Sequence, residues 1–284
     1  MASSVSLLTV TAIADRVDGI IRATNAGLTT ASAYAPACAD LVGATLAGNA
    51  ERYRLVVEAD VETLKGFQAV VLATGVTPRT PEIDGIDNAR VFSYTDVLRG
   101  NVRVGARVAL IGAGGIGFDV AEFLGHPNGH ETEFPRPETF ARHWGIDMSL
   151  GARGGVAGVD AEPEPLAREI WLLQRKATKP GKGLGKTTGW VHRLSLRQRG
   201  VRMLAGVQYR RIDDEGLHIH HDGSDKLLPV DNVVVCAGQL PRRELEEPLR
   251  SAGVEVHLIG GADVAMELDA KRAIWQGSEL AAAL

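Results

Sequence analysis

One glycine-rich stretch constrains the fold more than any other part of the chain. Residues 107–117 read RVALIGAGGIG, in which a short apolar run leads into a G-x-G-x-x-G sequence. A helix-like stretch, FDVAEFLG, follows at 118–125. A strand, this glycine pattern and a helix in that order are typical of a dinucleotide-binding βαβ unit. The sequence therefore predicts an α/β protein of the Rossmann type.

Each position of the pattern has an expected physical role. Gly112 permits the tight turn, Gly114 lets the backbone approach a pyrophosphate, and Gly117 lets the helix pack close to the strand. The pyrophosphate would bind the free N–H groups and the positive dipole end of the helix. The residues expected to contact it are Gly112, Gly114, Gly115, Ile116 and Gly117.

The end of the next apolar run indicates which dinucleotide is bound. Residues 169–174 read EIWLLQ, so Gln174 stands where an NAD-binding protein carries an acid for the ribose 2′-hydroxyl. Arg175 and Lys176 follow directly, which is the pattern expected for a 2′-phosphate. This favours NADPH over NADH. The alternative is that the two cations belong to an ordinary solvated loop.

Residues 179–188, KPGKGLGKTT, are similar to a Walker A loop and raise a second hypothesis, ATP hydrolysis at Lys186. The first glycine of that motif falls on Pro180, which lacks the N–H that a phosphate cradle uses. We therefore expect Lys182 and Lys186 to add positive charge near the phosphates of NADPH.

A strand-end motif occurs twice. Residues 73–79 read ATGVTPR and residues 236–242 read CAGQLPR, each after a buried-strand pattern. Two copies suggest two related nucleotide-binding domains with chain crossings near 75–105 and near 238, whereas the alternative is a pair of ordinary Gly-Pro turns. Near the C-terminus, a Gly-Gly-Ala-Asp sequence precedes a helix expected from about residue 265, so its aspartate binds a flavin ribityl hydroxyl or caps the helix. The candidate flavin-side residues are Ala73, Thr74, Gly75, Arg79, Gly238, Gly261 and Asp263.

Composition excludes several classes of function. The net charge of −4 gives no reason to expect nucleic acid or an anionic membrane as a partner. The two cysteines, Cys38 and Cys236, form no C-x-x-C, which argues against a disulfide framework, a zinc or iron–sulfur site and a redox dithiol, and favours a cytoplasmic setting. Cys236 is expected to be a packing residue. The polar segment 126–168 contains scattered histidines and glutamates, but their spacing matches no metal motif, so no metal site is expected.

From about Asp60 to the C-terminus the chain resembles the C-terminal part of the bacterial NADPH-dependent 2,4-dienoyl-CoA reductases, flavoproteins related to old yellow enzyme. The resemblance rests on ATGVTPRTPEIDGID, GAGGIGFDVA, WGID, LLQRKATKPGKGLGKTTGW, VDNVVVCAGQ and HLIGGADVAMELDAKRAI. It implies a two-dinucleotide (FAD/NAD(P)) fold, in which an NADPH domain interrupts a FAD domain, and hydride transfer from NADPH to FAD. In the full family an iron–sulfur cluster then passes electrons to FMN in a barrel, which reduces the dienoyl-CoA.

The chain departs from this family in two respects. The barrel is absent, and so is a first G-x-G-x-x-G for the FAD pyrophosphate. We expect a poorly matched segment at 1–50, a discontinuous and incomplete FAD-type domain at 51–100 and 236–284, and an NADPH-binding domain at 101–235. Hydride transfer requires no catalytic side chain, so none is assigned. The alternative is a non-catalytic NADPH-binding module, or a subunit whose partner supplies the barrel.

Overall fold

The computed structural model describes residues 60–126, 136–149, 151, 153–155, 158–266 and 270–283. The segment expected at 1–50 lies outside these residues. The chain divides into a first unit, residues 1–77 with 239–284, and a second unit, residues 78–238, and each is described by itself. Within the described ranges, the helices are too short or too polar to cross a bilayer.

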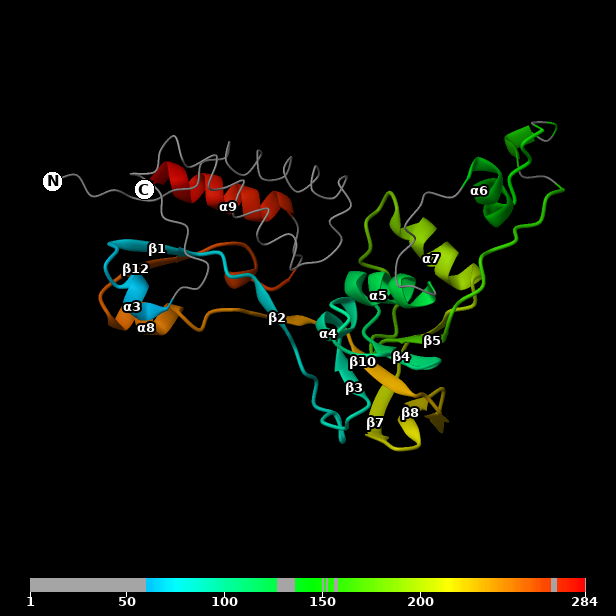
Figure 1. Ribbon diagram of the computed structural model, residues 1–284, viewed down its shortest axis with the longest axis horizontal. Helices are drawn as coiled ribbons and strands as arrows, with labels where there is room; N and C mark the ends of the chain where they lie inside the picture. Colours follow the sequence, from blue (N-terminus) through cyan, green and yellow to red (C-terminus); the bar gives the residue numbers. More distant parts are fainter. Residues whose placement is uncertain are drawn as a thin grey trace. The chain divides into compact units, whose positions relative to one another are not determined.

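The second unit is built on a five-stranded sheet whose neighbouring strands are all parallel. In order across the sheet, the strands are β3 (Val91–Ser93), β10 (Asn232–Val235), β4 (Arg107–Ile111), β5 (Glu169–Leu173) and β6 (Arg202–Leu204). Helix α5 (Gly115–Gly125) follows β4 and helix α7 (Gly189–Gln198) connects β5 to β6 (Figure 1). The predicted strand, glycine turn and helix are therefore present, and the carboxyl ends of the parallel strands share one edge of the sheet.

The period-two alternation of β4 divides the core into two layers. Val108 and Leu110 face a cluster that contains Phe118 of α5, whereas Ala109 and Ile111 face a second cluster on the other side of the sheet. All five of these residues are at most 1% exposed. A sheet buried on both faces explains why its strands read as continuous apolar runs.

A three-stranded antiparallel meander supplies the second cluster. Its strands are β7 (Gln208–Asp213), β8 (Gly216–His221) and β9 (Ser224–Leu228). A turn at Asp222 and Gly223 joins β8 to β9, with φ angles of 52° and 73°. Buried Leu217 and Ile219 of β8 pack under the parallel sheet, so helices cover one face of the sheet and the meander covers the other (Figure 1).

Residues 78–100, which the sequence assigned to the FAD-type part, lie in the second unit. They contribute β3, which pairs with β10, and helix α4 (Tyr94–Leu98), whose Val97 joins the α5 side of the core. The expected boundary lay at residue 100, whereas the chain divides between 77 and 78.

In the first unit, β1 (Ala69–Leu72) pairs in parallel with β12 (Glu255–Leu258). Helices α3 (Val61–Leu64) and α8 (Glu246–Ser251) complete a small core around Val70, Leu72, Leu249, Val254 and Val256. A short 3₁₀ turn, η3 (Gly260–Ala262), follows β12. Helix α9 spans Ala270–Ala283, so it begins later than the expected residue 265.

The segment between α5 and β5 contains α6 (Pro137–Trp144) and η2 (Arg153–Gly155). A cluster of polar side chains connects this segment to α5 and α7. The buried Arg199 guanidinium lies 3.0 Å from a Glu122 carboxylate oxygen and donates to the Glu164 carbonyl at 3.1 Å. His192 Nε2 lies 3.5 Å from the other Glu122 oxygen. Hydrogen bonding to Glu122 raises the pKa of His192 above 6.5, and the same hydrogen bond lowers the pKa of Glu122 below 4.5.

These pKa shifts predict a pH-dependent stability. Because the folded-state pKa of His192 is raised, its contribution is complete below about pH 6.5 and is lost as pH rises through the folded value. The Glu122 contribution is present above about pH 4.5 and is lost on acidification. We expect His192→Gln to lower Tm by about 1–3 °C more at pH 5.5 than at pH 8.5. His143→Gln, on α6, is the control, and an equal Tm loss for His192→Gln at both pH values would contradict the assignment.

Candidate dinucleotide-binding site

In the turn between β4 and α5, backbone atoms lie too close to two glycines to leave room for a side chain. Gly112 has a φ of 118°, and a Cβ atom there would lie 2.4 Å from the Cys236 carbonyl oxygen at the end of β10. A Cβ on Gly117 would lie 1.8 Å from the Gly112 carbonyl oxygen. Both glycines are therefore required by backbone approaches within the second unit.

The two glycines between them are in a different situation. Neither Gly114 nor Gly115 has a protein atom within 4 Å of the position that a Cβ would occupy. Gly114 is the N-cap of α5, and no side chain caps the helix there. Internal packing therefore does not account for these two glycines, and the first turn of an eleven-residue helix is open to an anion.

A structured turn presents the cations after β5. The side-chain amide of Gln174 donates to the carbonyl oxygen of Lys176 at 2.9 Å, and the Gly206 N–H donates to the same oxygen at 3.0 Å. Gln174, the residue in place of the NAD-type acid, thus fixes the shape of this turn. Arg175 and Lys176 are exposed, and neither forms an ion pair within the described ranges.

The lysine-rich loop lies beside the glycine turn. The N–H of Gly181 donates to the carbonyl oxygen of Ala113, the residue between Gly112 and Gly114, at 3.0 Å. Lys182 and Lys186 on this loop are exposed, and they too have no acidic partner in the part of the chain that the structure describes. The carboxyl edge of the sheet therefore brings together an open helix N-terminus and unpaired cations from two further segments.

A cavity of about 240 Å³ lies at the same edge. Arg175 forms part of its wall together with residues that the sequence analysis did not identify, which are Pro81, Glu82, Ile83, Val207, Gln208, Tyr209 and Ala237. Burial raises the pKa of the Tyr209 phenol, so it stays protonated at neutral pH. Val207, Gln208 and Tyr209 carry no motif, and only the folding of distant segments brings them beside Arg175.

The flavin-side candidates of the first unit also converge. Gly75 has a φ of 77° and no protein atom within 4 Å of a Cβ position, and a Cβ on Gly261 would lie 3.1 Å from the Gly75 carbonyl carbon. Ala73 and Thr74, which precede Gly75, are exposed. The Asp263 carboxylate accepts a hydrogen bond from the Gln276 amide at 2.7 Å. Because α9 begins at Ala270, Asp263 is not the helix cap that the alternative reading expected.

The two strand-end motifs pair with each other. Strands β2 (Val76–Pro78) and β11 (Gln239–Pro241) form a two-stranded sheet. The Arg79 N–H donates to the Gly238 carbonyl at 3.0 Å, and the Arg242 N–H donates to the Gly75 carbonyl at 3.0 Å. The Arg79 guanidinium donates twice to the Ala237 carbonyl, at 2.9 and 2.5 Å. In the structure Arg79 therefore stabilises the chain crossing.

Cys236 is a packing residue, as expected. Its side chain lies in the core beside α5, and the residue is 6% exposed. Burial raises the pKa of its thiol to about 12, so it has no thiolate character at neutral pH. It is therefore not a nucleophile in the folded protein.

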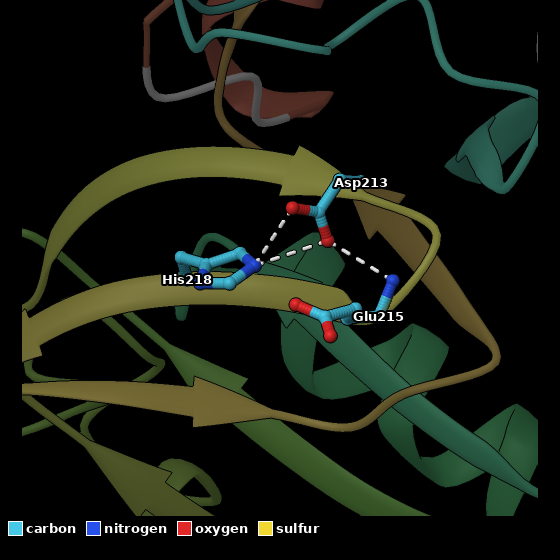
Figure 2. A group of neighbouring side chains, drawn as sticks. All are labelled: Asp213, Glu215 and His218. Carbon is cyan, nitrogen blue, oxygen red and sulfur yellow. Dashed lines mark hydrogen bonds and ion pairs between the residues drawn. The ribbon is translucent and has the colours of Figure 1, made fainter.

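Figure 2 shows a further group, Asp213, Glu215 and His218, at the turn between β7 and β8. His218 Nε2 lies 2.9 Å from one Asp213 carboxylate oxygen, and the other oxygen accepts the Glu215 N–H at 3.0 Å. The Arg211 guanidinium lies 2.7 Å from Asp213 and neutralises its charge. These contacts stabilise a hairpin turn, in which Asp213 is already engaged by His218 and Arg211.

Several reductases and an oxidase are similar to this chain in sequence. A metal reductase of Desulforamulus reducens is 26% identical over 206 residues, which are 69% of this chain and 28% of the relative. A cinnamate reductase of Clostridium sporogenes is 26% identical over 230 residues, 80% of this chain and 28% of the relative. An NADH oxidase of Thermoanaerobacter brockii is 28% identical over 78% of this chain and 29% of its own length. The chain thus spans less than a third of these relatives.

Solved structures share the fold. The complex of 2-naphthoyl-CoA reductase with 2-naphthoyl-CoA superposes with a TM-score of 0.61 and 22% identity, over 87% of this chain and 32% of that one. Histamine dehydrogenase from Rhizobium sp. 4-9 gives a TM-score of 0.57 and 15% identity, over 89% and 36%. Residues 43–275 match the pyridine nucleotide-disulphide oxidoreductase family. The chain therefore belongs to this oxidoreductase family, whose members bind FAD and NAD(P)H.

Proposed function

We propose that the second unit binds NADPH at the carboxyl edge of its parallel sheet and delivers a hydride to FAD bound by the first unit. The observation that carries this proposal is the open space at Gly114 on the uncapped N-terminus of α5. An anion placed there would meet helix N–H groups and the positive end of the helix dipole. The proposed pyrophosphate contacts are Gly112, Gly114, Gly115, Ile116 and Gly117.

Charge at the end of β5 supports NADPH as the dinucleotide. Arg175 and Lys176 are exposed without acidic partners among the described residues, so a 2′-phosphate would not compete with an internal ion pair. Gln174 offers an amide that is already engaged in its own turn, rather than a carboxylate for a ribose hydroxyl. We assign Lys182 and Lys186 to the other phosphates.

The proposed flavin contacts in the first unit are Ala73, Thr74, Gly75, Gly261 and Asp263. Gly238 and Arg79, which the sequence also assigns to the flavin side, belong to the second unit. The fit is supported by the open Cβ position of Gly75 and by Asp263, which Gln276 orients through one carboxylate oxygen. FAD, when bound, supplies the hydride-accepting chemistry. The protein contributes binding and orientation of the two nucleotides, and no side-chain acid or base is required for that step.

We propose a 2,4-dienoyl-CoA reductase type of enzyme, in which a barrel domain or a partner subunit reduces the dienoyl-CoA. The chain spans 28% of the metal and cinnamate reductases that it resembles, which also supports the second candidate, an NADPH-binding subunit that acts only with its partner. Genetic linkage to a lone barrel protein would favour this second candidate.

Replacing both Arg175 and Lys176 with alanine tests the coenzyme assignment. Each charged hydrogen bond is worth about 1.5–3 kcal/mol, so we expect the Kd for NADPH to rise about 10- to 100-fold. The Kd for NADH should change less than about threefold, because NADH has no 2′-phosphate. Calorimetric titration of the full chain with NADPH and with NADH measures both Kd values.

The matched control removes two exposed cations from the meander, Arg210 and Lys226. This variant should retain the wild-type preference, because neither residue lines the cavity. An unchanged NADPH preference in the Arg175→Ala/Lys176→Ala variant would remove the 2′-phosphate assignment.

Two glycine substitutions separate binding from folding. Gly114→Ala places a methyl group in open space, so its free energy of unfolding should stay within about 1 kcal/mol of wild type. Its NADPH affinity should fall at least about tenfold, since the methyl group takes the pyrophosphate position. Gly117→Ala creates a clash with backbone and should cost about 3 kcal/mol or more. Urea unfolding and NADPH titration distinguish the two effects, and wild-type affinity in Gly114→Ala would refute the pyrophosphate site.

A further inference from the structure

Arg193, on the first half of α7, has no assigned role in the site described above. Its Nε donates to the carbonyl oxygen of Pro180 at 2.9 Å, and its Nη2 donates to the carbonyl oxygen of Gly181 at 2.7 Å. The residue is half-buried, and no acidic side chain of the described ranges forms an ion pair with it. Its charge is therefore directed at two consecutive backbone carbonyls of the lysine-rich loop.

The same glycine also contacts the proposed pyrophosphate site. Gly181 accepts from Arg193 through its carbonyl, and its N–H donates to the carbonyl oxygen of Ala113 at 3.0 Å. Ala113 lies between Gly112 and Gly114 in the glycine turn. One residue thus connects α7 to the backbone that is expected to approach the coenzyme.

Close packing around Gly181 restricts movement of the contact between α7 and the glycine turn. Gly181 has a φ of 71°, and a Cβ there would lie 2.8 Å from the Phe118 ring and 2.7 Å from a Leu184 methyl group. Helix α7 is itself anchored by Leu196, which is fully buried against the sheet, and by the His192–Glu122 contact to α5. A displacement of the Arg193 head group would therefore be transmitted to the loop.

We propose that Arg193 is a positioning residue for coenzyme binding, which fixes the lysine-rich loop against the glycine turn so that Lys182 faces the coenzyme phosphates. This inference rests on the proposed NADPH-binding function. The planar guanidinium can donate to two adjacent carbonyls at once, whereas a lysine ammonium offers no such fixed fork. Without it, the loop would lose two charged hydrogen bonds.

The test compares three variants of the full chain by NADPH titration. We expect Arg193→Ala to raise the Kd for NADPH about tenfold and Arg193→Lys to give an intermediate value, because lysine restores one donor. Arg197→Ala removes an exposed arginine one turn later on the same helix and should leave the Kd at the wild-type value. Thermal unfolding of each variant shows whether the fold is retained, and Arg193→Lys keeps the test decisive if Arg193→Ala is unstable.

A double-mutant cycle with Lys182→Ala separates positioning from general destabilisation. If Arg193 acts by placing Lys182, the double variant should bind NADPH no more weakly than the weaker single variant. If the fold-changes in Kd of the two single variants multiply in the double variant, the inference is overturned. It is also overturned if the wild type binds NADPH and both Arg193→Ala and Arg193→Lys bind it within twofold of the wild-type Kd. A wild-type chain that fails to bind NADPH would overturn the proposed function as well.

Discussion

The close approach of three backbone segments at Gly112 is the constraint on which the rest of the second unit depends. The end of β10 reaches Gly112 from one side, and Gly117 brings the first turn of α5 onto its carbonyl from the other. A side chain at either glycine would separate the sheet from the helix. Because these contacts fix where α5 begins, they also fix the direction of its open N-terminus.

Around this turn, residues from distant parts of the sequence supply charge and shape. The turn after β5 presents Arg175 and Lys176, and the loop before α7 presents Lys182 and Lys186. Parallel strands end at one edge, so connections far apart in the chain become neighbours there. The site is therefore a property of the sheet topology, whereas each loop alone would be an unremarkable basic segment.

Polar contacts of α7 and the residue that follows it join α5 to the lysine-rich loop. His192 and Arg199 contact Glu122 on α5, and Arg193 between them contacts the lysine-rich loop. One helix thus both packs against α5 and supports the loop that carries cations.

Local sequence patterns predicted the helices, strands and turns that depend only on residues close together in the sequence. The apolar run, glycine turn and helix at 107–125 and the apolar run at 169–174 follow from spacing and residue type. Local patterns did not place residues 78–100 in the second unit, because this placement depends on the pairing of β3 with β10. The cavity wall at Val207 and Tyr209 and the contacts of Arg193 were missed, since they arise only when distant segments fold together.

The measurement that tests the account most directly is the visible spectrum of the full chain, incubated with FAD, before and after anaerobic addition of NADPH. The account predicts a protein-bound flavin band that bleaches with NADPH and more slowly with NADH, because hydride transfer to the flavin is the proposed reaction. A protein that retains no flavin, or a bound flavin that NADPH leaves oxidised, would contradict the claim that this chain carries out the transfer.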